Sequence, residues 1–118
     1  AHFAPDHFKV VDDGSRIVAT VALSLDDARP NVCWLKRLYL DPSLRGTGEG
    51  TRLLQWVIDT SQALGRSRIE LWSDVRFKRA HAFYRKHGFH HEGVVRTMTD
   101  GWAPYDEFFF YRNLDSSN

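Results

Sequence analysis

The sequence is poor in cysteine and has no long apolar run. Cys33 is the single cysteine among 118 residues, which excludes an internal disulfide framework and a cysteine-rich zinc site. No apolar run approaches the ~20 residues of a membrane-spanning helix, and we expect no signal peptide. Charge of one sign is not in excess either, since 16 Lys and Arg stand against 15 Asp and Glu. This balance argues against a nucleic-acid partner bound by bulk charge. We expect one soluble cytoplasmic domain over residues 1–118, with no membrane partner.

The hydropathy pattern predicts an α/β (α+β) fold of six strands and two helices. Their order is strand-strand-strand-helix-strand-helix-strand-strand. We expect strands at residues 8–11, 17–23, 32–40, 68–73, 93–98 and 107–111, one helix after residue 50, and a second helix at 78–87. The strand-helix-strand unit at 35–73 predicts one parallel pair in a mainly antiparallel sheet flanked by helices.

Two helical faces and one strand supply the expected core. The strand at 32–40 is apolar on both faces except at Lys36 and Arg37, which is typical of a central strand. The second helix should bury one apolar face. The apolar residues of these two helical faces are Leu53, Leu54, Val57, Ile58 and Leu64 in the first helix, and Ala80, Phe83 and Tyr84 in the second.

A glycine-rich segment, Arg45–Gly50, lies between the third strand and the first helix. Backbone N–H groups at the start of a helix favour a phosphate or pyrophosphate, and glycine lets an anion approach the main chain. Arg45 and Arg52 bracket the segment. No Lys-Ser/Thr pair follows, so this is not a P-loop, and the spacing is not that of a G-x-G-x-x-G loop. The alternative is a flexible turn without a ligand.

Two segments resemble motifs of the GNAT N-acetyltransferase superfamily. Leu38–Pro42 followed by Arg45–Thr51 is similar to the acetyl-CoA loop written Q/R-x-x-G-x-G/A. Ala80–Phe89 is similar to a second motif, A-x-x-x-Y-x-x-x-G-F. Both lie in the family's order and on the predicted elements, and the resemblance covers about residues 8–114.

The resemblance implies an acetyl-CoA-dependent enzyme without a metal. Tyr84 matches the family's general acid, although a core aromatic is the alternative. The pantetheine arm would lie beside the main chain of Leu38, Tyr39 and Leu40, where an N–H near Tyr39 or Leu40 would bind the oxyanion. The pyrophosphate would lie on the main-chain amides of Arg45, Gly46, Thr47, Gly48, Glu49, Gly50 and Thr51.

The general base is the weakest part of the resemblance. Trp34 and Trp72 occupy the positions where family members often carry a carboxylate, and neither accepts a proton. Asp74 is the better candidate base and Glu70 the other. The alternatives are a solvated surface charge for each carboxylate and a water chain to bulk solvent. Phe77 stands where the family often has an asparagine that binds the pantetheine arm.

Other polar groups carry weaker hypotheses. His87, His90 and His91 could suggest a metal, but no acidic or cysteine ligand has matching spacing, so we expect a solvated turn there. The last hairpin carries aromatic and acidic side chains that would suit a cationic amine, with a plain hairpin as the alternative. Its residues are Trp102, Tyr105, Asp106 and Glu107.

The family domain usually begins with a strand and two helices that this sequence lacks. We therefore expect either part of a longer chain or a homo-oligomer, such as a dimer, that covers an exposed sheet edge. The predicted function is transfer of acetyl from acetyl-CoA to a primary amine of a small molecule, or less readily of a protein. The alternatives are a non-catalytic acyl-CoA-binding or sensor module, and an interaction domain without cofactor.

Overall fold

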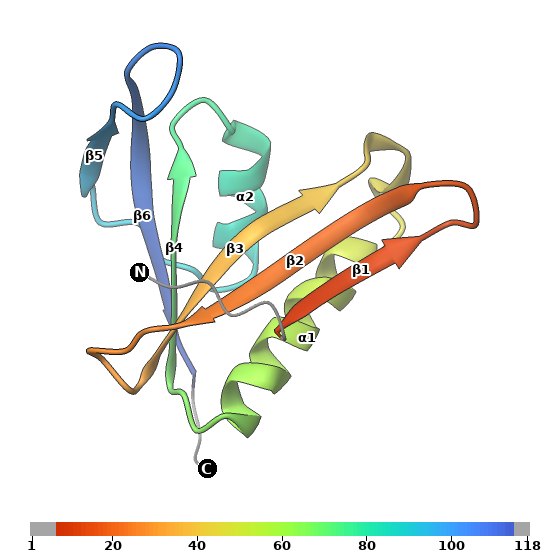
Figure 1. Cartoon of the computed structure of the whole chain (residues 1–118), viewed down its shortest axis with the longest axis horizontal. Helices are drawn as coiled ribbons and strands as arrows, with labels where there is room; N and C mark the ends of the chain where they lie inside the picture. The colour runs from red at the N-terminus through yellow and green to blue at the C-terminus, as the bar shows by residue number, and fades with distance from the viewer. Residues whose placement is uncertain (1–6, 115–118) are drawn as a thin grey trace. The chain divides into compact units, whose positions relative to one another are not determined.

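The computed structural model describes residues 7–114 and forms six strands and two α-helices over that range (Figure 1). The strands follow the hydrogen-bonded order β1-β2-β3-β4-β6-β5 in a mostly antiparallel sheet with one parallel pair, which confirms the predicted fold class. The elements are β1 (Phe8–Asp12), β2 (Ile17–Leu25), β3 (Val32–Leu40), η1 (Pro42–Leu44), α1 (Glu49–Ala63), β4 (Arg68–Asp74), α2 (Lys78–Lys86), β5 (Val95–Met98) and β6 (Tyr105–Asn113).

The chain groups into two compact units. The first comprises the described residues up to Ile69 together with Leu114, and the second comprises Glu70–Asn113. β4 begins in the first unit and continues into the second. The expectation of a single domain stays a prediction.

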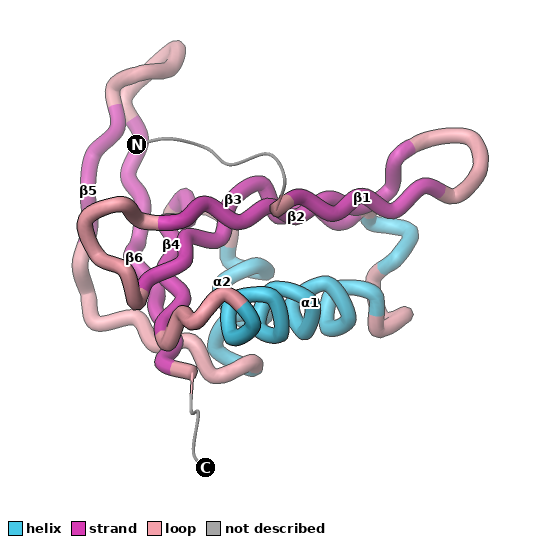
Figure 2. The backbone as a smooth tube through the Cα atoms, turned by 60° about the horizontal axis from the view of Figure 1, so that its bottom comes forward, coloured by secondary structure: helices cyan, strands magenta, loops and turns pink. Residues whose placement is uncertain are grey.

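In the first unit, α1 runs along one face of the β1–β3 strands (Figure 2). The predicted apolar face of α1 is buried at four of its five positions, Leu53, Leu54, Val57 and Ile58. Leu64 is the exception, because it forms the C-terminal cap of the helix and is 39% exposed. The chain turns there at Gly65, whose φ of 76° is left-handed and ends the helix.

The first residues of β4 belong to the parallel pair. The main-chain carbonyl of Asn31, just before β3, accepts hydrogen bonds from the amides of Ser67 (2.9 Å) and Arg68 (3.0 Å), just before and at the start of β4. The starts of the two strands therefore lie together, as parallel strands require. Helix α1 supplies the crossover connection between them.

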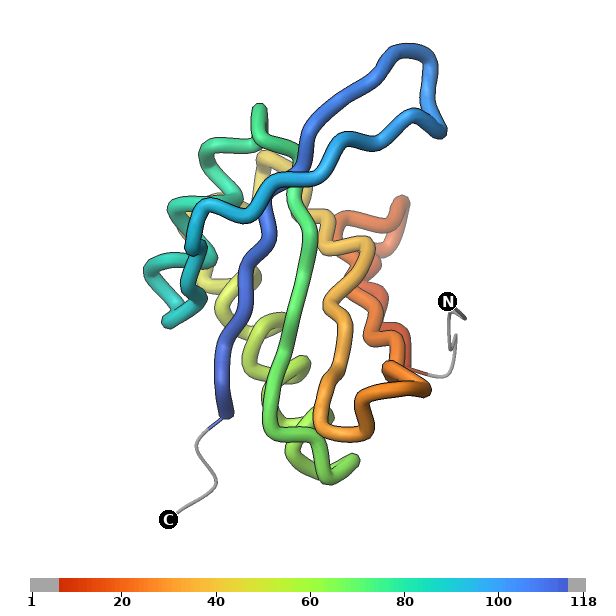
Figure 3. Tube along the Cα trace, turned by 90° about the vertical axis from the view of Figure 1, so that its left-hand side faces the viewer, coloured from red at the N-terminus to blue at the C-terminus, as the bar shows by residue number. Residues whose placement is uncertain are grey.

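In the second unit, β6 runs alongside β4 (Figure 3). The amide of Val75 donates to the carbonyl of Asp106 at 3.0 Å beyond the end of β4. β5 is shorter than predicted, because Gly93 has a left-handed φ of 81° and the strand begins only at Val95. In α2, Tyr84 is buried as expected, but the second fully buried side chain is His81.

Candidate functional site

β3 carries a bulge just before the segment predicted to contact the pantetheine arm. Between the pairs Ala22–Lys36 and Thr20–Tyr39, β3 has one more residue than β2. Arg37 takes the left-handed φ of 53° at this point, which is uncommon for a residue with a side chain. The Thr20 hydroxyl donates to the Arg37 carbonyl at 2.8 Å and holds the bulge. The strand ladder is therefore interrupted immediately ahead of Leu38–Leu40.

The glycine-rich segment joins η1 to α1 and is exposed from Arg45 to Gly48. Gly46 has φ 78°, and Gly48, the N-terminal cap of α1, has φ 85°. A Cβ added at either glycine would meet no atom within 4 Å, so backbone conformation and not crowding requires glycine. The surface over the main chain here is open to an approaching group.

Some amides of this segment are already hydrogen-bonded and others are not. Arg45 donates to the Pro42 carbonyl and Thr47 to the Leu44 carbonyl, both at 3.2 Å, and the Glu49 amide donates to the Thr47 hydroxyl at 3.3 Å. Within residues 7–114, no hydrogen bond is found for the amides of Gly46, Gly48 and Gly50. The N-terminal cap residue of α1, Gly48, has no side chain that could accept a helix amide. Alternate N–H groups of the loop thus remain available to an anion.

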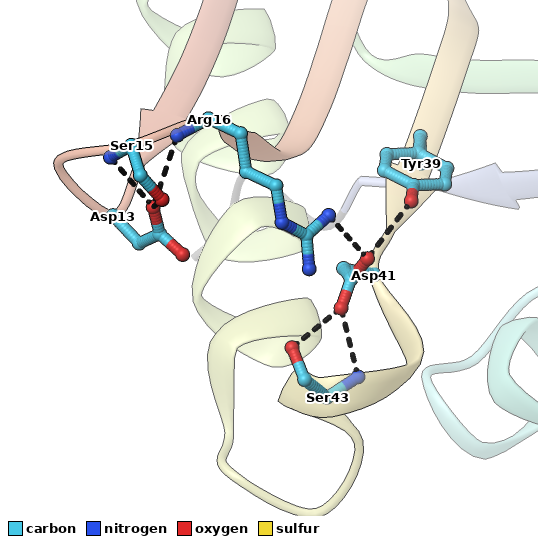
Figure 4. Close-up of polar contacts among 6 residues, drawn as sticks. All are labelled: Asp13, Ser15, Arg16, Tyr39, Asp41 and Ser43. Carbon is cyan, nitrogen blue, oxygen red and sulfur yellow. Dashed lines mark hydrogen bonds and ion pairs between the residues drawn. The ribbon is translucent and has the colours of Figure 1, made fainter.

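Sequence reasoning missed the role of Asp41, which lies between β3 and η1 (Figure 4). The buried carboxylate accepts hydrogen bonds from the Arg16 guanidinium (2.9 Å), the Tyr39 hydroxyl (3.2 Å), and both the amide (3.0 Å) and hydroxyl of Ser43. The hydrogen bonds from these donors, of which that from Arg16 has the largest effect, hold the pKa of the Asp41 carboxyl well below its ordinary value. The Asp-Pro-Ser spacing of a capping residue was the available sequence signal.

Tyr84 lies on α2 in an aromatic environment. It is 6% exposed, and its ring contacts those of Phe83, Phe89 and Phe110. Burial raises the pKa of the phenol above its ordinary value, so the hydroxyl keeps its proton at neutral pH. No hydrogen bond of this hydroxyl is found among the described side chains. Within residues 7–114 the group is thus a protonated donor for which no acceptor is found.

Asp74 and Glu70 are both buried, at 8% and 1% exposure, so their interpretation as solvated surface charges is wrong. The Asp74 carboxylate pairs with Arg76 through two guanidinium contacts and also accepts the Arg76 amide at 2.9 Å. These bonds lower the pKa of Asp74 from 3.8 to about 2. A carboxylate with such a pKa is a weak proton acceptor.

His81 is a buried polar side chain that sequence reasoning did not select. Its Nε2 atom lies 3.0 Å from the Asp74 carbonyl oxygen and 3.1 Å from the Ser73 hydroxyl. Because a carbonyl oxygen only accepts, Nε2 carries the hydrogen, and burial lowers the pKa of the imidazole. The spacing of three residues to Tyr84 places both on one helical face and was the available signal.

The tryptophans at the usual base positions have other contacts. The Trp34 indole N–H donates to Asp26 at 2.9 Å. The Trp72 ring lies 5.1 Å from that of Phe109, and the Arg96 guanidinium lies 4.2 Å from its centroid. Neither indole has a group that accepts a proton from an amine.

Of the three histidines after α2, His90 is exposed as expected, whereas His87 and His91 are half-buried. His87 packs on Phe83 with 4.6 Å between ring centroids, and His91 packs on Phe108 at 4.4 Å. In the part of the chain that the structure describes, no three His, Cys, Asp or Glu side chains group as metal ligands do.

Trp102, at the tip of the last hairpin, is fully exposed, and Phe77, which precedes α2, is 58% exposed. No described helix is long and apolar enough to cross a membrane.

Comparisons with known proteins agree on one family. The chain is 37% identical over 71 residues to an uncharacterized N-acetyltransferase of Methanocaldococcus jannaschii, covering 60% of this chain and 30% of the relative. It is 23% identical over 86 residues to the aminoalkylphosphonate N-acetyltransferase of Salmonella typhimurium, covering 70% of this chain and 56% of the relative. The chain thus spans about a third to a half of the length of these curated relatives.

A solved structure shows the same fold. A Salmonella typhimurium protein determined with its cofactor acetyl-CoA superimposes with a TM-score of 0.73 at 16% identity, covering 94% of this chain and 66% of that chain. The family model for the acetyltransferase (GNAT) family matches residues 1–89, which include β3, the glycine-rich segment and the motif around Tyr84. The chain therefore belongs to the GNAT acetyltransferase family.

Proposed function

We propose that this protein is an N-acetyltransferase that moves the acetyl group of acetyl-CoA to a primary amine of a small molecule. The observation that carries the proposal is that the amides of Gly46, Gly48 and Gly50, at the start of α1, make no hydrogen bond in the described part of the chain. Such amides, at the positive end of a helix, suit the diphosphate of coenzyme A. Arg45 and Arg52 are exposed beside them and add positive charge. Family membership supports acetyl-CoA as the cosubstrate.

The proposed reaction is direct transfer. The neutral amine nitrogen attacks the acetyl carbonyl carbon, the carbon–sulfur bond breaks, and the sulfur leaves with the electron pair. The Tyr84 hydroxyl donates its proton to that sulfur, and the tyrosinate recovers a proton from solvent. An ammonium group of pKa near 10.4 must first lose one proton to become a nucleophile, and its nitrogen loses a second proton to water as the amide forms. A main-chain N–H at Tyr39 or Leu40 is the proposed donor to the oxyanion.

The proton acceptor for the amine is proposed to be water connected to bulk solvent. Asp74 was the candidate base, but its pairing with Arg76 keeps the carboxylate weakly basic. Trp34 and Trp72 offer no alternative. Because Asp74 is weakly basic and the two indoles accept no proton, a second candidate function is a module that binds acyl-CoA without turnover.

The acceptor is proposed to be a small molecule, as in the Salmonella typhimurium aminoalkylphosphonate N-acetyltransferase to which the chain is similar. The exposed Trp102 would suit a cationic amine, whereas Glu107 pairs with Arg96 and Asp106 accepts from the Thr97 hydroxyl. A cytoplasmic location is a prediction from the single cysteine of the sequence. Cys33 is buried as a free thiol.

The acetyl-CoA loop is tested by exchanging one left-handed glycine. Gly48→Ala forces a side chain into φ 85° and should destabilise the fold by about 1 kcal/mol while weakening acetyl-CoA binding measured by calorimetry. Gly65→Ala, at φ 76° after α1, is the matched control and should destabilise similarly with unchanged binding. Wild-type protein that releases no heat of binding would contradict the proposed cosubstrate.

Tyr84 is tested by Tyr84→Phe, which removes only the hydroxyl. The rate of thiol release with an amine panel should fall about a hundredfold, because general acid catalysis contributes on this scale. Tyr111→Phe, which loses a surface hydrogen bond to Glu92, is the control and should keep the wild-type rate. A Tyr84→Phe enzyme at full rate with every accepted amine would remove the assigned role, and wild-type binding without turnover would favour the binding module.

Asp74 is tested by Asp74→Asn in acid. The folded pKa of about 2 lies below the ordinary value of 3.8, so the carboxylate stabilises the fold above about pH 4, and this contribution is lost as pH falls toward about 2. The free energy of unfolding measured in urea should therefore fall less steeply over that range in the variant. Asp59→Asn on the exposed face of α1 should follow the wild-type curve. An Asp74→Asn curve parallel to wild type would show that the ion pair is absent.

Homo-oligomer formation is proposed from the edge of the sheet. Among the described strands β1 is an edge strand, and its Phe8 and Val10 are 41% and 40% exposed. An open apolar edge favours pairing with another copy. Light scattering should give a dimer or larger, and Val10→Lys should shift it toward the monomer. A wild-type monomer at high concentration would contradict this proposal.

A further inference from the structure

The Asp41 carboxylate gathers donors from three separate segments of the first unit. The Arg16 guanidinium comes from the β1–β2 hairpin, the Tyr39 hydroxyl from β3, and the amide and hydroxyl of Ser43 from η1 (Figure 4). The Asp41 amide also donates to the Val18 carbonyl at 2.8 Å. Asp41 is 7% exposed, whereas the glycine-rich segment that follows is exposed. It is therefore a fixed point of the backbone just before a segment with few contacts.

A series of short-range hydrogen bonds connects this fixed point to the start of α1. The Leu44 amide donates to the Asp41 carbonyl at 2.9 Å. The Leu44 carbonyl then accepts from both the amide (3.2 Å) and the hydroxyl (2.6 Å) of Thr47, and that hydroxyl accepts the Glu49 amide. Gly46 and Gly48 have no side chain to hold them. The positions of their amides are therefore set through this series, which begins at Asp41.

We propose that Asp41 is a positioning residue for the acetyl-CoA loop. In this proposal the positive charge of Arg16 compensates the Asp41 carboxylate, which would otherwise repel a bound diphosphate. The proposal rests on the proposed function, because it concerns binding of acetyl-CoA. A carboxylate ordinarily repels an anion in its neighbourhood. The guanidinium of Arg16, 2.9 Å from Oδ1, compensates the charge while the carboxylate orients η1.

Three changes separate the geometric role from the electrostatic one. Asp41→Ala removes every acceptor from the cluster. Asp41→Asn keeps one carbonyl oxygen for the Ser43 amide but loses the charge that holds Arg16. Arg16→Gln leaves the carboxylate without its compensating cation. The double variant Arg16→Gln with Asp41→Asn has neither charge, so the two effects on binding should be less than additive.

Asp26 offers a matched control in the same unit. Its carboxylate also accepts two main-chain amides, those of Ala28 and Arg29, and an indole N–H from Trp34, and it pairs with Arg29. It orders the β2–β3 turn, which is distant in sequence from the glycine-rich segment. Asp26→Asn therefore removes a comparable carboxylate cluster without altering the series that leads to α1.

Binding and exchange measurements on the purified protein test the proposal. Asp41→Ala should raise the Kd and KM for acetyl-CoA about tenfold, Asp41→Asn and Arg16→Gln about threefold each, with kcat and the amine KM unchanged. In the free protein, hydrogen exchange of the Thr47 amide should accelerate in Asp41→Ala and Asp41→Asn. Asp26→Asn should leave the Kd and the Thr47 exchange as in wild type.

Each outcome decides a different point. If wild type binds acetyl-CoA and both Asp41 variants bind it equally well, the positioning role is wrong and the proposed function stands. If both Asp41 variants lose affinity only in proportion to Asp26→Asn, the effect is general destabilisation and the inference is again wrong. Wild-type protein that fails to bind acetyl-CoA overturns the proposed function and this inference with it. Should Asp41→Ala fail to fold, Asp41→Asn carries the same comparison.

Discussion

The structure around the candidate site depends on a backbone that is bent left-handed at Gly46 and Gly48. In that conformation the chain leaves β3, makes a short η1 turn and enters α1, and the amides of Gly46, Gly48 and Gly50 make no hydrogen bond within residues 7–114. The first N–H groups of a helix have no acceptor within the helix, and exposed ones bond to water or to a ligand. The exposed amides of this segment suit a site for an anion, and the two glycines allow the left-handed backbone conformation that presents them.

Hydrogen bonds stabilise the backbone next to the exposed glycine-rich segment. Asp41 joins the β1–β2 hairpin, the end of β3 and η1, and the Arg37 bulge is held by the Thr20 hydroxyl. Both features lie on the N-terminal side of the glycine-rich segment, and a fixed backbone there favours preorganised binding, since less of the loop must be ordered when the ligand arrives. These contacts fix the backbone that leads to the loop amides.

Much of the fold followed from periodicity. The apolar spacing from Leu53 to Ile58 placed α1, and alternating apolar residues placed all six strands within a few residues. Leu64 was misassigned because the last helical residue is Ala63, and Leu64 is the C-terminal cap just before Gly65. The site was only partly predictable. The motif located the loop and Tyr84, but the burial of His81 and the pairing of Asp74 with Arg76 depend on how α2 and β4 pack, which no local pattern specifies.

The loop amides are proposed to bind the diphosphate of coenzyme A. The most direct measurement follows the backbone amide resonances of a nitrogen-15-labelled protein during titration with acetyl-CoA. The amides of Gly46, Gly48 and Gly50 should show the largest downfield proton shifts and saturate together, while that of Gly65 stays in place. Saturable binding that leaves those three resonances unmoved would contradict it.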